Sequence, residues 1–310
     1  MEPYEEFRPL MFSIAYRMTG SISDAEDIVQ EAFVRLARAT GPSGGSAEGT
    51  PVSSPKAYLA TVTTRLAIDH LRSARVRRES YVGAWLPEPL VYDTEPDPAE
   101  HAEMSDSLSM AFLVLLESLS PDERAVFLLR EAFGYDYDEI AGIVEKSEAN
   151  CRQIFARARG RIEEGKPRFE SSRSQREEVA RRFLAAADGG DMGKLLELLA
   201  PDVVCYADGG GKTQAISRPV YGREHVARLV AGLFRQGRVL RVSFRPVWVN
   251  GQPGTITFDA EGRVVSVFAF DVLDGVVQAI RSVVNPDKLG HLGVVSDIAR
   301  APGRRGGRAP

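Results

Sequence analysis

Hydrophobic residues in the first part of the chain recur every three or four positions, a spacing typical of amphipathic helices. Residues 3–18, 23–39 and 56–80 each carry such a stripe, with polar residues between its members. Ser23 and Ser54 stand at the start of the second and third stripes, and serine is a preferred N-cap residue. The sequence therefore predicts three helices that pack through their apolar faces.

A second group of helices is predicted within residues 119–162. Capping-box pairs precede its first two helices and a serine precedes the third; these residues are Ser120 with Glu123, Asp136 with Glu139, and Ser147. Only a few residues around Glu145 join the second and third helices, which is the connection length of a helix-turn-helix. Apolar positions at helical spacing define the buried side of the third helix: Cys151, Phe155, Ala158 and Ile162.

The opposite side of this third helix suits the major groove of DNA. Amide and guanidinium groups can form paired hydrogen bonds to base edges, and further arginines can neutralise phosphates. The side chains concerned are Asn150, Arg152, Gln153, Arg157, Arg159 and Arg161. An ordinary solvated face on a small helical bundle is the alternative interpretation, and the spacing favours DNA reading over it.

The pattern changes after Ser174. Two helices, to Ala187 and over residues 191–199, precede segments in which apolar and polar residues alternate. Strands are expected near 202–207, 239–249, 255–260, 263–272 and 275–284. Because the turn signals NGQPG, AEG and LDG separate consecutive strands, we predict a meander with helices on one side, an α+β domain.

Composition indicates a soluble, multidomain protein. A length of 310 residues fits two or three domains. No apolar run approaches the roughly 18 residues of a membrane span, and the acidic start is unlike a signal peptide, so a cytoplasmic protein without membrane contact is expected. Cys151 and Cys205 fall in separate domains without metal-ligand spacing, so we expect reduced core cysteines and neither a metal nor a cofactor.

Charge is unevenly distributed along the chain. The formal net charge is −4, yet arginines crowd the end of the third predicted helix, from Arg65 to Arg78. From Glu79 to Glu123 there is no lysine or arginine, whereas eleven acidic residues occur. Two basic segments separated by an acidic one indicate a protein that contacts nucleic acid at two places.

Two sets of motifs resemble the extracytoplasmic-function sigma factors of bacterial RNA polymerase. DAEDIVQEAF and PKAYLATVTTRLAIDHLR are similar to sigma region two, and SPDERAVFLLREAFGYDYDEIAGIVEKSEANCRQ is similar to region four. The resemblance covers about residues 5–165, in the family's order, and implies core RNA polymerase and promoter DNA as partners. The chain departs from the family at Glu145, where glycine is frequent, and at Cys151, where valine is usual.

The resemblance assigns three binding surfaces. The helix that docks on core polymerase matches Asp24, Asp27, Gln30 and Glu31. Without the resemblance, this acidic row is either ordinary helix surface or a docking ridge for a basic partner. The reader of the minus-ten element matches Ala60, Thr61, Arg65, Asp69 and Arg72, followed by a basic track for the DNA backbone at Arg75, Arg77 and Arg78. The reader of the minus-thirty-five element matches Ser147, Asn150, Arg152, Gln153 and Arg157.

The C-terminal half is similar to the SnoaL-like branch of the NTF2-like superfamily, through FLAAADGGDMGKLLELLAPDV and the helix and strand order. WLPEP, DGGGK and NPDKL match short motifs of the sigma-factor group with a fused SnoaL-like extension. The resemblance implies an interdomain regulatory contact made by Trp85, Leu86, Pro87, Asp208, Gly210, Lys212, Asn285, Asp287 and Lys288. The expected divisions are 1–79 for region two, 80–107 for an acidic linker, 108–168 for region four, 174–290 for the SnoaL-like domain and 291–310 for a disordered tail.

The linker has two interpretations. Its prolines keep the backbone extended, but a solvated linker does not need Trp85, Leu86, Leu90 and Tyr92, so we expect these side chains to pack. They enter the polymerase channel in one hypothesis. In the other, WLPEP docks on the C-terminal half.

The function of the extension also has alternatives. SnoaL relatives include enzymes with an acid/base residue in the cone, for which Asp208, His225 and Asp271 are the candidates here. We favour a regulator without catalysis, because a tethered domain sees its target at about millimolar concentration. A small-molecule ligand for the extension stays open. For the whole chain, the rival is a transcription regulator that binds duplex DNA without polymerase.

Overall fold

The computed structural model describes residues 2–40, 54–78, 81–93, 108–165 and 172–298. It divides into two compact units, of which the first contains Met1–Ser80 and Phe112–Lys166 and the second contains Tyr81–Ala111 and Pro167–Pro310. None of the helices in the described ranges combines the length and the apolar character that a membrane crossing requires.

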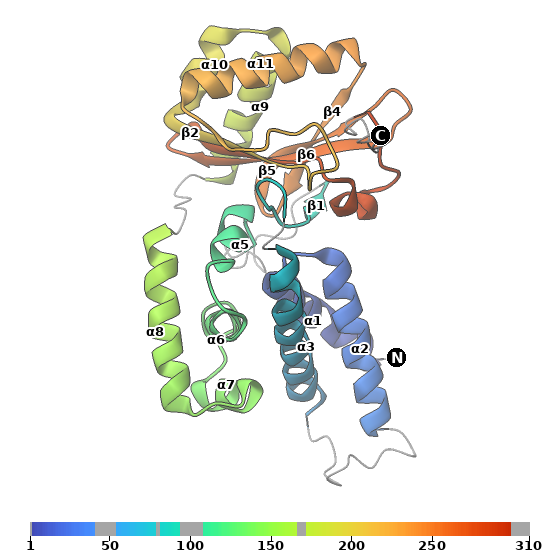
Figure 1. Ribbon diagram of the computed structural model, residues 1–310, viewed down its shortest axis with the longest axis vertical. Coiled ribbons are helices and arrows are strands. Elements are labelled where there is room, and N and C mark those ends of the chain that lie inside the picture. The colour runs from blue at the N-terminus through green and yellow to red at the C-terminus, as the bar shows by residue number, and fades with distance from the viewer. Residues whose placement is uncertain (1, 41–53, 79–80, 94–107, 166–171, 299–310) are drawn as a thin grey trace, which may run out of the picture. The chain divides into compact units, whose positions relative to one another are not determined.

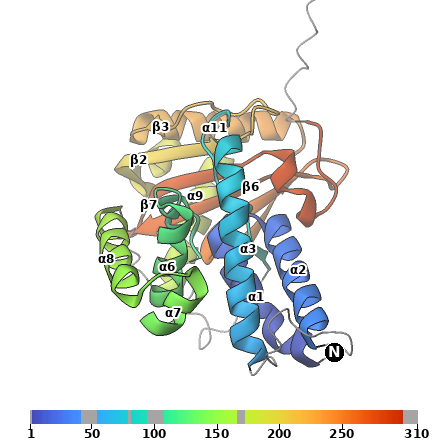
Figure 2. The ribbon, with the colours of Figure 1, turned by 60° about the horizontal axis from the view of Figure 1, so that its bottom comes forward.

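Three helices form the first part of unit one, as predicted: α1 (Glu2–Thr19), α2 (Ile22–Thr40) and α3 (Pro55–Arg78). Both ribbon views show them side by side (Figures 1 and 2). Their apolar faces meet in a core that contains Met11, Ile14, Val29 and Leu59, each at most 1% exposed. The start of α2 differs from the prediction, because the hydroxyl of Ser21 and not that of Ser23 accepts the amide of Asp24, at 3.1 Å.

The second group of helices contains α6 (Pro121–Glu131), α7 (Tyr137–Val144) and α8 (Glu148–Gly165), after the short α5 (Met110–Leu116). Both predicted capping boxes are present, and Ser147 accepts the amide of Asn150 at 3.3 Å. Glu145 ends α7 in the left-handed region, at φ 54°. The residue that departs from the family's glycine therefore adopts the backbone conformation that glycine favours, and the short turn is kept.

Unit two is an α+β domain, which confirms the predicted class. Its helices are α9 (Arg173–Gly189), α10 (Met192–Leu198) and α11 (Arg223–Val239). Its strands are β1 (Val91–Tyr92), β2 (Leu199–Asp208), β3 (Val220–Tyr221), β4 (Ser243–Val249), β5 (Gln252–Phe258), β6 (Val264–Leu273) and β7 (Val276–Val283). The sheet order is β1-β4-β5-β6-β7-β2-β3, and β4 to β7 form the predicted antiparallel meander. The sheet also contains a parallel pairing, between β2 and β7.

Helices α9, α10 and α11 lie along one face of this sheet (Figure 1). The core between the helices and the sheet includes Phe183 of α9 and Phe270 of β6. Their rings pack edge to face, with the ring centres 5.4 Å apart. The expected strand start at residue 239 is wrong. α11 continues to Val239, and Arg241 at φ 54° turns the chain before β4 begins.

Two segments outside the predicted sheet are also folded. β1, from the linker, pairs with β4. Within residues 291–310, which the sequence assigns to a tail, Val295 bridges to Val264, and Ser296 donates a hydrogen bond to Asp259 at 2.6 Å. Residues 299–310 lie outside the described residues. Residues 295 and 296 thus belong to the folded part of unit two.

Candidate functional site

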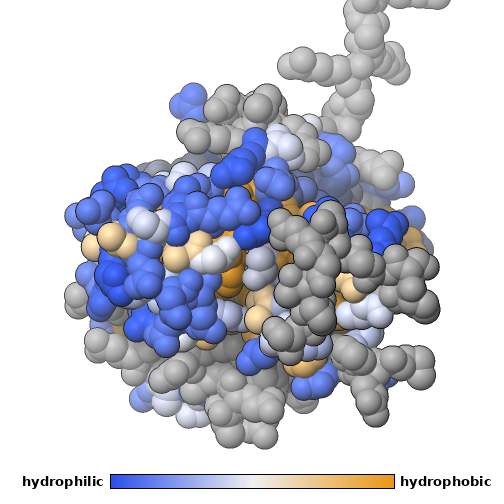
Figure 3. Space-filling view, turned by 90° about the horizontal axis from the view of Figure 1, so that it is seen from below, coloured by the Kyte–Doolittle hydropathy of each residue, from blue (hydrophilic) through white to orange (hydrophobic). Residues whose placement is uncertain are grey.

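The outer face of α8 carries the polar side chains that the sequence assigns to DNA reading. Cys151, Ala158 and Ile162 are buried, as predicted, whereas Phe155 is half-buried. The five residues assigned to the minus-thirty-five reader are all exposed: Ser147, Asn150, Arg152, Gln153 and Arg157. The surface on the side of α7 and α8 is largely hydrophilic (Figure 3). Their role in binding DNA stays a prediction.

Helix α3 presents part of the predicted minus-ten surface. Thr61 is half-buried and Arg65, Asp69 and Arg72 are exposed. Ala60 differs, since it is 0% exposed and contacts the protein interior in this structure. The structure therefore corrects the prediction that Ala60 lies on the exposed surface of α3. Arg75, Arg77 and Arg78 belong to α3, but their side chains lie outside the described residues.

Arg65 is held by the helix-turn-helix. Its guanidinium donates to the carbonyl oxygens of Ile143 and Gly142, at 2.9 and 2.8 Å, and pairs with Glu145 at 3.0 Å. The residue expected to read promoter DNA thus contacts the C-terminal end of α7 and its C-cap residue Glu145, within the same unit. The sequence gives no local signal for this contact, because the partners are 77 and 78 positions apart.

Asp122 forms a second link between α3 and the helix-turn-helix. Its carboxylate accepts from Arg72 at 2.9 Å and pairs with Lys146 at 2.8 Å. Burial alone would raise the pKa of Asp122, but Lys146 and Arg72 outweigh it and lower that pKa. A third link is a buried hydrogen bond, which Arg124 donates to the carbonyl oxygen of Met18 at 2.6 Å. These contacts join the two helix groups into one unit.

The acidic residues of α2 form the row that the sequence predicted. Asp27 and Gln30 are exposed. Asp24 lies 3.3 Å from His70 of α3, and Glu31 accepts from Arg35 at 2.8 Å. Part of this row is therefore paired within the unit, while Asp27 faces solvent. The core-polymerase contact stays a prediction.

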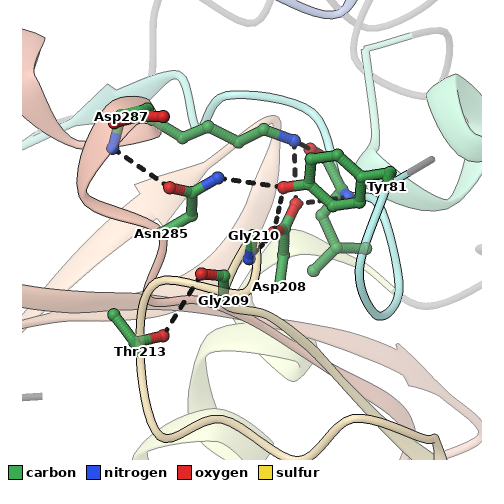
Figure 4. Close-up of polar contacts among 9 residues, drawn as sticks. Tyr81, Asp208, Gly209, Gly210, Thr213, Asn285 and Asp287 are labelled. Carbon is green, nitrogen blue, oxygen red and sulfur yellow. Dashed lines mark hydrogen bonds and ion pairs between the residues drawn. The ribbon is translucent and has the colours of Figure 1, made fainter. Parts of the chain in front are cut away.

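The second unit contains a buried polar site that holds the linker. Asp208, at the end of β2, is 0% exposed. Its carboxylate accepts from the Tyr81 hydroxyl at 2.5 Å, from the Leu86 amide at 2.8 Å and from the Gly210 amide at 3.1 Å (Figure 4). Asn285, after β7, donates to the Tyr81 hydroxyl at 2.9 Å. Burial and then the hydrogen bond to Asp208 raise the pKa of Tyr81 well above its usual range, so its proton stays on the hydroxyl.

Lys288 completes this site. Its ammonium group donates to Asp208 at 2.8 Å and to the carbonyl oxygen of Leu86. It also lies 4.4 Å from the ring centre of Trp85 and 5.1 Å from that of Tyr81. Asp208 and Lys288 thus bind both main-chain groups of Leu86, the N–H and the C=O. We call Asp208, Asn285 and Lys288 the linker clamp.

The other predicted interdomain residues surround the linker clamp. Leu86 and Pro87 are buried and Trp85 is half-buried. Lys212 and Asp287 form an exposed pair at 2.5 Å. A Cβ atom on Gly210 would come within 2.4 Å of Asn285, so glycine is needed where this loop approaches the clamp. The nine residues named from the motifs therefore gather in one region, whereas Tyr81 was missed because no motif includes it.

The docked linker continues past the clamp. His291 contacts the carbonyl of Pro89 at 2.9 Å, and Asn250 exchanges two hydrogen bonds with Leu90, at 3.0 and 2.9 Å. Of the two interpretations of WLPEP, the structure shows docking on the C-terminal half. The contact points at Leu86, Pro89 and Leu90 extend through WLPEP to the residue that precedes β1.

The candidates for acid/base catalysis do not converge. Asp208 belongs to the linker clamp, His225 is exposed on α11 beside the carbonyl of Tyr221, and Asp271 is buried in an ion pair with Arg281. Burial raises the pKa of Asp271 despite that partner. Among the described residues, no group of three or more His, Cys, Asp or Glu side chains is arranged to hold a metal ion.

Comparisons with known proteins follow the same division. Residues 3–77 match the family model for Sigma-70 region 2, residues 109–162 that for Sigma-70 region 4, and residues 180–282 that for a SnoaL-like domain. The chain is 37% identical over 295 residues to the ECF RNA polymerase sigma factor SigJ of Mycobacterium tuberculosis, covering 92% of this chain and 91% of that protein. It is 33% identical over 292 residues to the probable ECF RNA polymerase sigma factor SigI of the same organism, covering 92% and 93%.

A solved structure supports the fold as well. The crystal structure of Mycobacterium tuberculosis SigJ aligns with a TM-score of 0.72 at 33% identity, over 93% of this chain and 97% of that chain. The similarity therefore extends through both helical groups and the mixed sheet.

Proposed function

The chain belongs to the ECF RNA polymerase sigma factors, and from this premise we propose that it binds core RNA polymerase, directs initiation at specific promoters and is regulated in cis by its SnoaL-like domain. The first two parts follow from the matches to regions two and four and from the named relatives. The third rests on one observation, the grip of the linker clamp on both main-chain groups of Leu86.

The physical argument concerns the linker. A sigma factor that reads two promoter elements needs the segment between its two readers to reach across the polymerase. Here that segment is bound at Leu86, Pro89 and Leu90 by residues of the C-terminal half. Because the C-terminal half belongs to the same chain, it meets the linker at an effective concentration of about millimolar, so a modest affinity suffices to hold it. Docking thus limits the arrangements of the two readers that remain accessible.

The contacts of Arg65 fit this proposal. Its guanidinium is bound to the carbonyls of Gly142 and Ile143, so the predicted minus-ten reader must leave these partners before it binds DNA. The free protein is thus in a conformation that promoter binding changes. We assign the SnoaL-like domain the role of controlling how readily that change occurs.

In vitro transcription tests the proposal. The variant Lys288→Met removes the charge that binds Asp208 and Leu86. Lys194→Met is the matched control, because Lys194 forms an exposed pair with Asp191 and is not among the predicted regulatory residues. With core polymerase, Lys288→Met should change the amount of transcript severalfold at an unchanged promoter, and Lys194→Met should not. Equal output from both variants would contradict regulation through the linker clamp.

The same assay separates the rival class. A regulator that works without polymerase binds its site on duplex DNA alone, whereas a sigma factor starts transcription at a promoter only with the core enzyme. Specific DNA binding that core polymerase leaves unchanged, together with no transcript, would contradict the sigma-factor assignment of this chain.

A further inference from the structure

A cavity of about 250 Å³ lies between the sheet and the helices of unit two. Its wall contains Phe183 of α9, Phe234 of α11, and Phe244, Phe268 and Phe270 of the sheet. Ile298, from the folded C-terminal segment, also contributes to the wall. The cavity is separate from the linker clamp, since neither Asp208 nor Lys288 lines it.

The wall is uncharged. None of the described residues that line the cavity is Asp, Glu, Lys, Arg or His. Burial raises the pKa of Cys205 to about 12, so this thiol is neutral at ordinary pH. Thr257 and Ser266 share a hydrogen bond at 2.6 Å, and Thr255 donates to the carbonyl of Arg245 at 3.0 Å. These hydroxyls are occupied by protein partners, so the wall offers mainly apolar and aromatic contacts.

We propose that this cavity binds an uncharged, largely aromatic small molecule and that its occupancy strengthens the linker clamp. An apolar cavity of about 150 Å³ is enough for one benzene ring. The larger volume here fits a molecule of about two or three fused or linked rings. A charged ligand would lose its hydration without gaining a partner, which excludes carboxylates and alkylammonium ions as good ligands. The absence of an acid or base from the described wall makes this a binding site and not a site of proton transfer.

The cavity is connected to the linker clamp through the chain itself. Ala207 lines the cavity and Asp208 is the next residue; Val284 lines the cavity and Asn285 is the next residue. A hydrogen bond joins the end of β2 to the residue that follows β7, because the amide of Val284 donates to the carbonyl oxygen of Asp208 at 2.9 Å. A ligand that contacts these wall positions therefore restricts the two residues that hold Tyr81.

The loop between β2 and β3 makes a third connection. Gln214, Ala215 and Ile216 line the cavity, while Gly210 donates to Asp208 at 3.1 Å. Thr213, between them, donates to the carbonyl of Gly209 at 3.4 Å (Figure 4). Because a bound ligand adds dispersion contacts to the atoms of the wall, it stabilises all three segments in their docked positions.

This inference rests on the regulatory role proposed above, and linkage provides a test that does not use transcription. If a ligand strengthens the clamp, an intact clamp must strengthen ligand binding by the same factor. The probe is phenylnaphthylamine, an uncharged fluorophore with two linked ring systems. Its sulfonate, anilinonaphthalenesulfonate, is the charged counterpart. Both are titrated into the full-length protein and followed by fluorescence.

Two variants locate the probe. Val265→Trp fills the cavity from its half-buried wall position, and Val239→Trp adds the same side chain at a site that is 80% exposed and outside the wall. Phenylnaphthylamine should bind one site, lose at least tenfold in affinity with Val265→Trp and keep its affinity with Val239→Trp. Equal affinity of phenylnaphthylamine for the wild type and Val265→Trp would overturn the assignment of the cavity. Equal affinity of the wild type for the sulfonate and for phenylnaphthylamine would overturn the ligand class.

Lys288→Met and the control Lys194→Met, at an exposed position outside the cavity wall, then test the coupling. The first variant should lower the affinity for phenylnaphthylamine about fivefold or more, since fivefold is the low end of typical coupling between two sites. The second variant should leave this affinity unchanged. Equal affinity in both would overturn the coupling. Circular dichroism checks folding, and Tyr81→Phe, which keeps the Lys288–Asp208 pair, replaces Lys288→Met if that variant unfolds. An unchanged transcript level with Lys288→Met would refute the proposed regulation alone, because the titration measures binding independently.

Discussion

Lys288→Met should destabilise unit two far more than a surface substitution of the same kind. Asp208 is fully buried and the Lys288 side chain is 10% exposed, so the variant leaves a buried carboxylate without its cation. Breaking such a pair costs about 3 to 5 kcal/mol. Tyr81, Leu86 and Gly210 still donate to Asp208, and Met keeps most of the aliphatic chain. We therefore expect the free energy of unfolding to fall by about 3 kcal/mol.

The assay is urea unfolding of full-length protein. Trp85 and Trp248 are the two tryptophans of the chain, so Trp248→Phe in both backgrounds leaves Trp85, which lies against Lys288, as the reporter. With a slope of about 2 kcal/mol per molar urea, the midpoint should fall by about 1 to 2 M. The control Lys194→Met should cost less than about 1 kcal/mol, because its pair with Asp191 is exposed.

A double-mutant cycle sharpens the interpretation of that result. Asp208→Asn combined with Lys288→Met removes the unpaired buried charge, so the double variant should lose less than the sum of the two single losses. A midpoint for Lys288→Met within about 0.2 M of that for Lys194→Met would refute the reasoning, because it would mean that the buried pair contributes no more than an exposed one.

Three further predictions concern the other surfaces. Asp122→Asn should lower the stability of unit one by less than about 1 kcal/mol in thermal unfolding, because Asp122 is partly exposed. The pKa of Asp122 is lowered in the folded state, so its contribution is present above about pH 4 and lost as the pH falls through the folded pKa; a variant with the acid sensitivity of the wild type would contradict this. Burial would raise the pKa of Asp259, but hydrogen bonds from Ser296 and Arg263 outweigh it and lower that pKa to about 2. Unit two should therefore lose stability as the pH falls from about 4 to about 2, and Asp259→Asn should flatten this dependence in pH titrations of unfolding. An unchanged slope would count against the link to the C-terminal segment. Asp27→Lys should weaken binding to core polymerase about tenfold, or about 1.4 kcal/mol, relative to the exposed control Glu224→Lys, as measured by fluorescence anisotropy; equal affinities would remove α2 from the interface.

Local signals in the sequence predicted local structure well. The capping boxes at Ser120 and Asp136 set helix starts, and alternation with turn signals gave the meander, because both patterns act between near neighbours in the chain. Resemblance to short motifs brought Trp85, Asp208 and Lys288 into one proposed contact, and the structure places them together.

Contacts between distant segments could not be predicted in the same way. Neither the hydrogen bonds of Arg65 to the C-terminal end of α7 nor the hydrogen bond of Tyr81 to Asp208 has a periodic signature. The start of β4 was misplaced for a related reason. Apolar residues near Leu240 fit a helix end and a strand equally well, and only the left-handed backbone of Arg241 decides between them.

Hydrogen exchange of residues 81–92, followed by mass spectrometry, tests the linker clamp most directly. The amide of Leu86 is buried and donates to Asp208, and that of Leu90 donates to Asn250, so both should exchange slowly in the wild type and in the control Lys194→Met. In Lys288→Met, exchange of this segment should be at least tenfold faster, because a loss of about 1.4 kcal/mol already changes the open population by that factor. Rapid exchange in the wild type, or equal protection in both variants, would contradict the account.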